Sequence, residues 1–422
     1  MPEYRGIEYL RGKLAEKRER VLVRYKFYDM KYFVKDFGIA NRETLQYLNS
    51  VVGWCGKAVD SVADRLVIDE FDQDDFGFND IMNLNNKDIF TGAAIQDALI
   101  SSCSFIYISK DTDGFPRLQT ITAGDATGVI DPITYMLTEG YAVLERDKFK
   151  KATLEAYFTA EGTWYYQGNE VVDYVENPAP YALLVPIINR PDAMRPFGRS
   201  HISRACMSIV KSAIRTIRRS EISAEYYSFP QKYVTGLSQD AERMDTWKAT
   251  ISSFLAFEKD DEGDHPVLGQ FQQQSMTPYE SQLKMFAGLF AGETGLTLDD
   301  LGFPSQNPSS AEAIKSSHET LRLITRKAQR DFGVGLKNAG YLAACVRDKY
   351  PYKRELVASV TAKWEPIFEP DNSALSVIGD GVIKINQAID GYFDKESLRD
   401  LTGVEPAAEA TAPGIILPDA EG

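Results

Sequence analysis

Residues 197–236 carry the clearest pattern in the chain, because apolar and basic positions recur there with the period of an α-helix. Ser200 is placed to cap this helix and Pro230 to end it. At about 100° per residue the basic side chains share one stripe, which consists of Arg204, Lys211, Arg215, Arg218 and Arg219. The opposite side is apolar and consists of Ile202, Ile209, Val210, Ala213, Ile214 and Ile217. The pattern predicts a two-faced helix whose basic side needs an anionic partner or an acidic neighbouring chain.

The residues before this helix predict a mixed region of helices and strands. Helical periodicity covers residues 5–35, 41–66 (with Asn41 as a cap) and 88–101. Short β-like pieces separated by Asp-Gly, Gly-Asp and Gly-Asn turns then occupy residues 104–109, 117–122, 140–145, 153–159 and 163–167. Five prolines make residues 177–198 an extended connector. The predicted fold class is α+β.

A small separate lobe is predicted between the two-faced helix and a second helix at residues 278–292. Its expected elements are a strand at 232–236, a helix near 241–255, an acidic hairpin at 258–264 and a Gln-rich strand at 267–274.

A loop and a long helix follow the second helix. Pro304 and Pro308 hold the loop open, and Ser309 with Glu312 forms a capping box that starts a helix running to about Arg347. A bend is expected where glycines recur, at Gly333, Gly335 and Gly340. The polar stripe of this helix suits either an aqueous lumen or an ordinary solvated face, and consists of Lys315, Glu319, Arg322, Arg326 and Arg330.

The remaining residues predict a strand within 358–370, helices at 373–389 and 394–401, and an acidic tail at 405–422 that we expect to be disordered.

The composition is that of a soluble globular protein with two or more domains, since 44% of the 422 residues are hydrophobic and 26% are charged. A net charge of −14 disfavours a protein that grips DNA through a basic groove, but not one that DNA must pass without sticking. No apolar run is long enough for a membrane span or a signal peptide, so we expect a cytosolic product that does not bind membranes. The four cysteines are expected to be buried free thiols.

Motifs for catalysis or metal binding are weak. The three histidines have no metal-ligand spacing, and no phosphate-binding loop or nucleophile elbow appears. Residues 72–77 resemble the start of a calcium loop, but Phe76 and Asn83 stand where oxygen ligands are needed, which favours a solvated acidic loop. The sequence therefore predicts no catalytic residue, no bound metal and no cofactor.

Five motifs, in this order, resemble those of the portal proteins of tailed bacteriophages, the head-to-tail connectors. They are VDSVADRLVIDEF (59–71), ALISSCSFIYI (98–108), VPIINRPDAMRPFGRSHISRACMSIVKSAI (185–214), FPQKYVTG (229–236) and NPSSAEAIKSSHETL (307–321). The resemblance implies a wing (1–198), a first stem helix (199–230), a clip (231–273), a second stem helix (274–300), a tunnel loop (301–310), a kinked tunnel helix (311–350), a return strand to the wing (351–372), short crown helices (373–404) and the acidic tail.

The resemblance also implies a function without catalysis. A ring of about twelve copies, a dodecamer, would form the channel at one capsid vertex of the virion through which double-stranded DNA is packaged and ejected. The expected partners are other copies of the chain, DNA bound without sequence specificity, the large terminase, a head-completion adaptor, and the major capsid and scaffolding proteins. The chain would reside in the host cytoplasm during assembly.

Neutral polar side chains are the expected DNA contacts, because they can touch phosphates without holding them. In the predicted tunnel loop these are Ser305, Gln306, Asn307, Ser309 and Ser310. Weak positive rings behind them are expected from Lys315 and Arg322, which together with Arg326 form the polar face of the tunnel helix. The basic stem face is expected to meet mostly other protein.

The alternative that the sequence leaves open is a metal-dependent nucleic-acid-processing enzyme. Its carboxylates would come from acidic loops, either Asp72, Asp74 and Asp75 or Asp260, Asp261 and Asp264.

Overall fold

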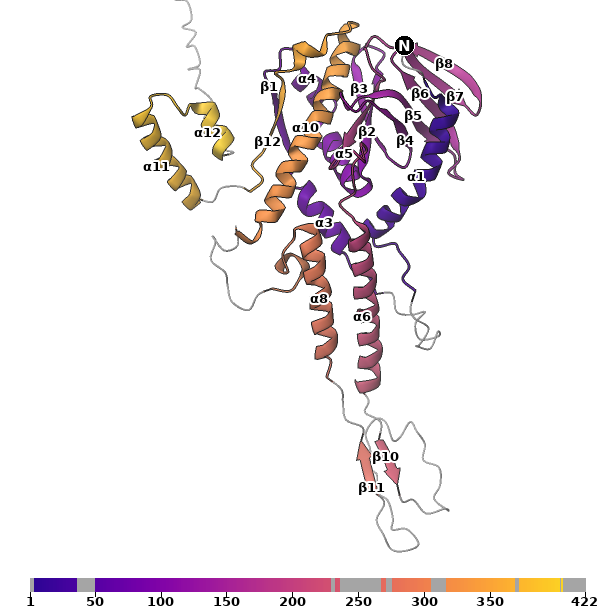
Figure 1. The fold of residues 1–422 in the computed structure, drawn as a ribbon, viewed down its shortest axis with the longest axis vertical. Helices are drawn as coiled ribbons and strands as arrows, with labels where there is room; N and C mark the ends of the chain where they lie inside the picture. Colours follow the sequence, from indigo (N-terminus) through magenta and orange to yellow (C-terminus); the bar gives the residue numbers. More distant parts are fainter. Residues whose placement is uncertain are drawn as a thin grey trace, which may run out of the picture.

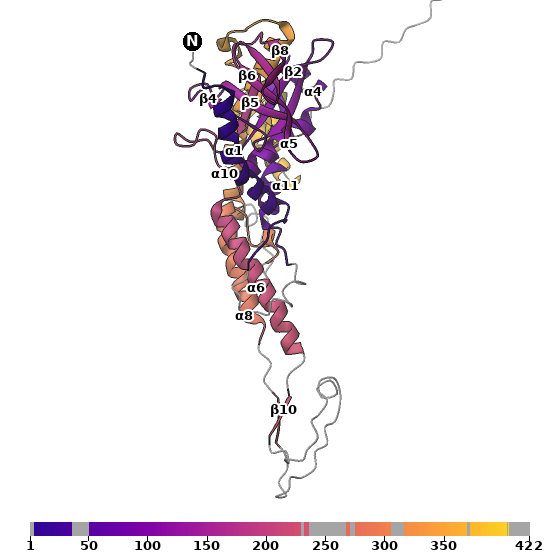
Figure 2. The ribbon, with the colours of Figure 1, turned by 90° about the vertical axis from the view of Figure 1, so that its right-hand side faces the viewer.

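The computed structural model describes residues 4–35, 50–228, 232–235, 267–270, 275–304, 316–368, 372–402 and 404. A broad body of helices and sheets carries two helices that project from it side by side and lead to a small pair of strands at the far end (Figure 1). The view turned by 90° shows the same elongated outline (Figure 2). The mixture of helices and strands agrees with the predicted α+β class.

Two antiparallel sheets form most of the body. The larger has the order β4-β5-β6-β7-β8 and consists of β4 (Ala126–Ile130), β5 (Leu137–Arg146), β6 (Ala152–Thr159), β7 (Gly162–Gln167) and β8 (Glu170–Glu176). The smaller has the order β3-β2-β9 and consists of β2 (Cys103–Lys110), β3 (Pro116–Thr122) and β9 (Leu184–Ile188). All five predicted strands are present, whereas β4, β8 and β9 were not expected.

The predicted extended connector at 177–198 is wrong where it contains β9. All five residues of this strand are buried, and Pro186 lies opposite Phe105 of β2. A proline is tolerated because β9 is an edge strand, so the missing N–H does not interrupt a ladder on its outer side. The proline-rich composition concealed a strand of the core.

Helices cover these sheets and enclose a large hydrophobic core. They are α1 (Ile7–Tyr28), α3 (Trp54–Ala63), α4 (Phe78–Leu84) and α5 (Lys87–Ser101). Phe78, Phe105 and Phe332 are each at most 1% exposed within this core. A second, smaller cluster lies between α1 and the large sheet. The predicted helix at 5–35 ends at Tyr28, and the predicted cap Asn41 lies outside the described residues.

An acidic run at 69–75 leads into the predicted solvated loop at 72–77. Its first half belongs to β1 (Ile68–Asp72), which pairs antiparallel with β12 (Thr361–Trp364), within the predicted strand at 358–370. Ile68 and Phe71 are buried while the acidic neighbours lie outward. The long separation in sequence between the two strands hid this pairing from local pattern.

The first projecting helix, α6 (Arg204–Ser228), begins later than predicted. Ser200 does not cap it: the Ser200 hydroxyl is buried, donates to the carbonyl of Ile100 (2.5 Å) and accepts from the amide of Ile202 (3.0 Å). Ser203 takes the capping position, because its hydroxyl accepts a hydrogen bond from the amide of Cys206 (3.2 Å). The second projecting helix, α8, spans Thr277–Thr294.

The strands at the far end are β10 (Lys232–Thr235) and β11 (Val267–Gln270), which pair antiparallel. The predicted helix and acidic hairpin between them lie outside the described residues.

The long helix α10 (Glu319–Asp348) is α-helical without interruption past its three glycines. Two of them instead allow close packing. A Cβ on Gly335 would lie 2.7 Å from Ile187 and 3.1 Å from the carbonyl oxygen of Pro186, and one on Gly340 would lie 2.8 Å from the Phe78 ring. These two glycines thus serve close packing, and the bend expected here stays a prediction. The predicted capping box at Ser309 and Glu312 lies outside the described residues.

Two C-terminal helices, α11 (Asn372–Ala388) and α12 (Lys395–Thr402), stand beside the body (Figure 1). The guanidinium of Arg399 on α12 lies 2.6 Å from the Glu70 carboxylate and 3.8 Å from that of Asp69. Two 3₁₀ turns, η1 (Asp299–Leu301) and η2 (Arg354–Val357), complete the elements. The predicted acidic tail lies outside the described residues.

Candidate channel and stem interface

The stem is the antiparallel pair of α6 and α8, which pack along their length. Among the described side chains, hydrogen bonds join α6, or the residue before it, to α8 at three places. They join Ser203 Oγ to Glu293 Oε1 (2.7 Å), Thr216 Oγ1 to Gln282 Oε1 (2.9 Å) and Ser223 Oγ to Tyr279 Oη (2.7 Å). Because they recur along the stem, they hold the register of the two helices as well as their separation.

The apolar side of α6 is buried as the sequence predicted. Among these residues Val210, Ala213 and Ile214 are fully buried, while Ile209 and Ile217 are partly buried against the core. Phe290 of α8 is fully buried, with its ring centroid 5.7 Å from that of Trp54 on α3. The stem is therefore rooted in the core of the body.

The basic stripe of α6 is not one continuous face. Arg204 and Arg219 are exposed and Arg215 is half-buried, but Arg218 is only 8% exposed and donates to the carbonyl of Val34 (2.8 Å). Lys211 lies over the Phe27 ring, 5.5 Å from its centroid. The C-terminal end of α1 and the residues after it cover part of the predicted stripe, so Arg218 is buried against protein and Lys211 is partly buried.

The polar face of α10 carries a locally balanced charge. Arg322 makes a bidentate pair with Glu319, at 2.7 Å for each of the two bonds, and this pair raises the pKa of Arg322. Arg326 is exposed, while Lys315 lies outside the described residues. Because Glu319 stands three residues before Arg322, it offsets most of the positive charge expected there.

The expected DNA contacts, Ser305, Gln306, Asn307, Ser309 and Ser310, also lie outside the described residues, but the two flanks of this segment meet. The His318 Nε2 lies 3.4 Å from the Asp300 Oδ2. Burial works against ionisation of Asp300, yet bonds from the amide and hydroxyl of Thr297, together with His318, keep the pKa of Asp300 below its ordinary value. The pair ties the start of the segment to its end, a role that the spacing of the histidines did not reveal.

The acidic loop proposed for metal binding uses its carboxylates elsewhere. Asp74 accepts hydrogen bonds from the amides of Phe76, Phe78 and Asn79, at 2.8–3.3 Å, at the start of α4. Within the described ranges, no group of three or more His, Cys, Asp or Glu side chains is placed to hold a metal ion. Asp260, Asp261 and Asp264 lie outside those ranges.

The four thiols and the imidazole of His201 are buried. All four cysteines are buried free thiols, as predicted, and burial raises the pKa of Cys345 to about 11. Burial lowers the pKa of His201 to about 4, so its imidazole is neutral at pH 7. Each helix of the described residues is too short or too polar to cross a lipid bilayer.

A body from which two paired helices carry a small β lobe is the arrangement expected of the portal class of ring-forming connectors. The chain is 26% identical over 333 residues to the portal protein of Mycobacterium phage L5, covering 73% of this chain and 67% of the relative. It is likewise 26% identical over 347 residues to the portal protein of Mycobacterium phage D29, covering 75% and 69%. The resemblance read from the five motifs is thus confirmed as similarity to bacteriophage portal proteins.

Other comparisons add less. No family model matches the sequence. Chains from two solved structures, described as the virion of a native gene transfer agent (GTA) particle and the neck of a native GTA particle with C12 symmetry, are each 14% identical. Each match covers 84% of this chain and 90% of the other, with TM-scores of 0.46 and 0.45.

Proposed function

We propose that copies of this chain form a ring-shaped portal channel at one capsid vertex, through which double-stranded DNA is packaged and ejected. The observation that carries the proposal is the similarity to two phage portal proteins over about three quarters of the chain. The ring contains about twelve copies and is homo-oligomeric, a closed symmetry that repeats one kind of contact around an axis. The role is structural and not catalytic, and the protein resides in the virion.

The stem acts as a stiff strut in this proposal. The 25 residues of α6 span about 37 Å, and its bonds to α8 keep the two helices in register. The β10–β11 pair at the end of the strut belongs to the clip, which serves as the docking platform for terminase and later for head-completion and tail proteins. The capsid and scaffolding proteins contact the body.

DNA moves through the channel without being bound tightly, because the side chains around its path carry little positive charge. Glu319 offsets most of the positive charge of Arg322, and Arg218 and Lys211 contact the body. Neutral groups at Gln306 and Asn307 make the closest contacts, backed by Lys315, Arg322 and Arg326. Six to ten phosphate contacts make binding steeply salt-dependent, so a ring of strongly basic subunits would clamp DNA and stop its movement.

Electron microscopy of the purified full-length chain tests this function directly. Rings with a central channel are expected by negative staining. Particles assembled without the chain are expected to contain no packaged DNA, and supplying the chain is expected to restore packaging. A chain that stays monomeric and cleaves DNA when magnesium is added would contradict the proposal and favour the enzymatic alternative. The structure does not support that alternative at Asp74, because this carboxylate accepts hydrogen bonds from amides at the start of α4.

A further inference from the structure

Strand β8 presents a surface that an isolated protein rarely leaves uncovered. All seven of its residues are exposed, and it is the last strand of the five-stranded sheet. Its four apolar side chains are between 40% and 53% exposed; they are Val171, Val172, Tyr174 and Val175. Exposed apolar edge strands invite pairing with other chains, so natural proteins usually blunt or cover them. Three acids, Glu170, Asp173 and Glu176, make the strand negatively charged.

Helix α10 presents a surface of complementary chemistry. Leu323, Lys327, Arg330 and Val334 are all exposed, and their spacing of four, three and four residues places them on one stripe of the helix. Arg190 is also exposed and, with Lys327 and Arg330, lies close enough to Asp331 to influence its pKa. The stripe therefore combines apolar positions with a net positive charge. Arg330 also belongs to the polar stripe predicted from the sequence, and Arg326, four residues before it, borders the stripe described here.

A cavity of about 320 Å³ opens beside this stripe. Ile188 and Val334 form part of its apolar wall, and Arg330 stands at its exposed rim. Asn338 lines the cavity and is only 3% exposed, and its Nδ2 has no hydrogen-bond partner among the described residues. A buried amide donor without a partner is costly, and an acceptor that enters the cavity would satisfy it.

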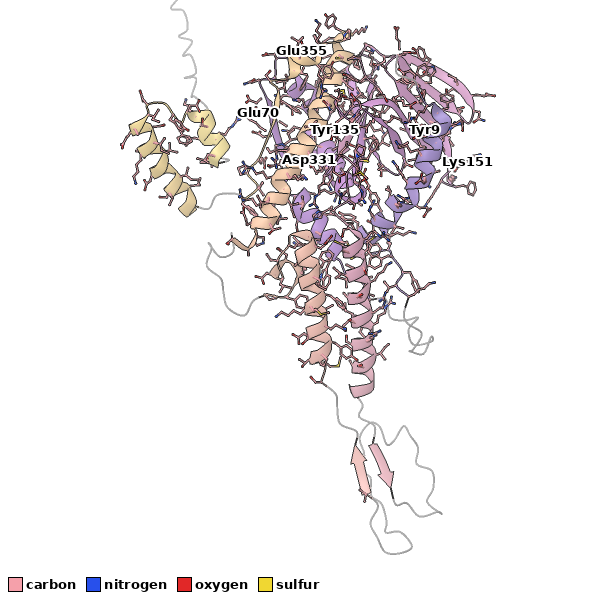
Figure 3. The ribbon with its side chains drawn as sticks, viewed as in Figure 1. Tyr9, Glu70, Tyr135, Lys151, Asp331 and Glu355 are labelled. Carbon is pink, nitrogen blue, oxygen red and sulfur yellow. The ribbon has the colours of Figure 1, made fainter. Side chains whose placement is uncertain are left out.

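The two surfaces agree in length and lie on opposite sides of the body. The stripe from Leu323 to Val334 is about 16 Å long, and β8 is about 20 Å long. In Figure 1, β8 lies at the outer edge of the large sheet, across the body from α10. Figure 3 shows Asp331 and Tyr135 on the α10 side and Lys151 on the β8 side. Complementary surfaces on opposite sides of one chain make head-to-tail contacts, which form a ring when the rotation from one copy to the next closes.

We infer that β8 of one copy docks along the α10 stripe of the next copy and that this contact closes the ring, an inference that rests on the proposed portal function. The acids of β8 face Lys327, Arg330 and Arg190. An apolar side chain of the strand enters the cavity, and an oxygen of the strand accepts from Asn338.

Charge reversal tests the contact. Lys327→Glu with Arg330→Glu is expected to weaken self-association by about tenfold or more, measured by sedimentation at fixed salt, because like charges would face one another. Glu170→Lys with Asp173→Lys on β8 is expected to do the same from the other side. The four changes together are expected to recover most of the lost association. The control, Lys148→Glu with Lys150→Glu, makes the same charge change in the exposed β5–β6 turn and should leave association unchanged.

Cross-linking tests the pairing itself. Asp173→Cys and Lys327→Cys in one chain are expected to give ladders of linked copies with a short bismaleimide, since the native cysteines are buried. Asp173→Cys with Lys151→Cys, both on the β8 side, is expected to give none. The contact would be overturned if the wild-type chain forms rings, the charge-reversal variants associate as strongly as the wild type, and the Asp173→Cys, Lys327→Cys variant gives no ladder. That result would leave the portal function standing. A wild-type chain that stays monomeric and cleaves DNA when magnesium is added would overturn both.

Discussion

At the scale of single residues, Asp97 carries the clearest consequence of burial. It is 6% exposed between α1, α5 and β3, where its carboxylate accepts hydrogen bonds from Tyr25 and Thr122. Burial raises the pKa of Asp97 to about 6, although these hydrogen bonds oppose the rise. The ordinary value in an unfolded chain is about 3.9, so the folded state holds a proton over a range of pH where the unfolded state does not.

The Asp97 contribution to the free energy of unfolding is therefore expected to fall as the pH rises from about 4 to about 6. Asp97→Asn should flatten this dependence and stabilise the protein at pH 7 by up to about 2–3 kcal/mol. Urea unfolding followed by circular dichroism across this range measures the effect. Asp113→Asn, an exposed position in the β2–β3 turn, is the control. Identical pH profiles for the Asp97→Asn variant and the wild-type protein would contradict this effect of burial.

Gln306 and Asn307 provide a functional prediction at the same scale. Gln306→Asp with Asn307→Asp places two negative charges per copy beside the DNA path, so DNA packaging or retention is expected to fall while rings still form. The DNA content of assembled particles, together with ring counts by microscopy, measures this. Gln306→Ser with Asn307→Ser keeps neutral polar groups and should package normally. Full packaging by the Asp variant would argue against a contact at this loop.

At the scale of elements, the effect of a Gly→Ala change in a helix depends on whether the new methyl group meets a neighbouring element. Gly340→Ala would place a Cβ 2.8 Å from the fully buried Phe78 ring, so we expect a loss of about 1–3 kcal/mol from overpacking. Gly288→Ala in α8 meets nothing within 4 Å and should instead stabilise its helix by about 0.5–1 kcal/mol. Chemical denaturation of both variants checks the opposite signs. If both variants changed the free energy of unfolding by the same amount and sign, α10 would not pack closely against α4.

The stem illustrates which features of an element can be read from its own residues. The apolar side of α6 and the extent of α8 followed from helical periodicity. The predictions that Ser200 caps α6 and that Arg218 belongs to an open basic face were wrong, because the partners of both side chains come from distant segments. Ser200 donates to the carbonyl of Ile100 at the end of α5, and Arg218 donates to the carbonyl of Val34 after α1. A local pattern identifies a polar side chain but not the partner that the fold brings to it.

At the scale of the whole molecule, Arg399 ties the C-terminal helices to the body. Its guanidinium meets both Asp69 and Glu70 of β1 (Figure 3 labels Glu70 beside α12). Arg399→Ala is expected to weaken this attachment by about 1 kcal/mol and to speed proteolysis at the link between β12 and α11 about fivefold. Lys384→Ala, an exposed change on α11, is the matched control. Unchanged cleavage in the Arg399→Ala variant would show that other contacts hold the helices.

The sequence by itself determined the α+β class, the paired stem helices, the buried cysteines and the resemblance to portal proteins. These depend on periodicity, composition and motif order, all of which are properties of neighbouring residues or of their order along the chain. Only tertiary structure decided three features: the pairing of β1 with β12, the place of Pro186 in an edge strand, and the burial of Arg218 within the basic stripe of α6. Each depends on contacts between residues far apart in sequence, because backbone hydrogen bonds and buried cations must find partners that no local pattern specifies.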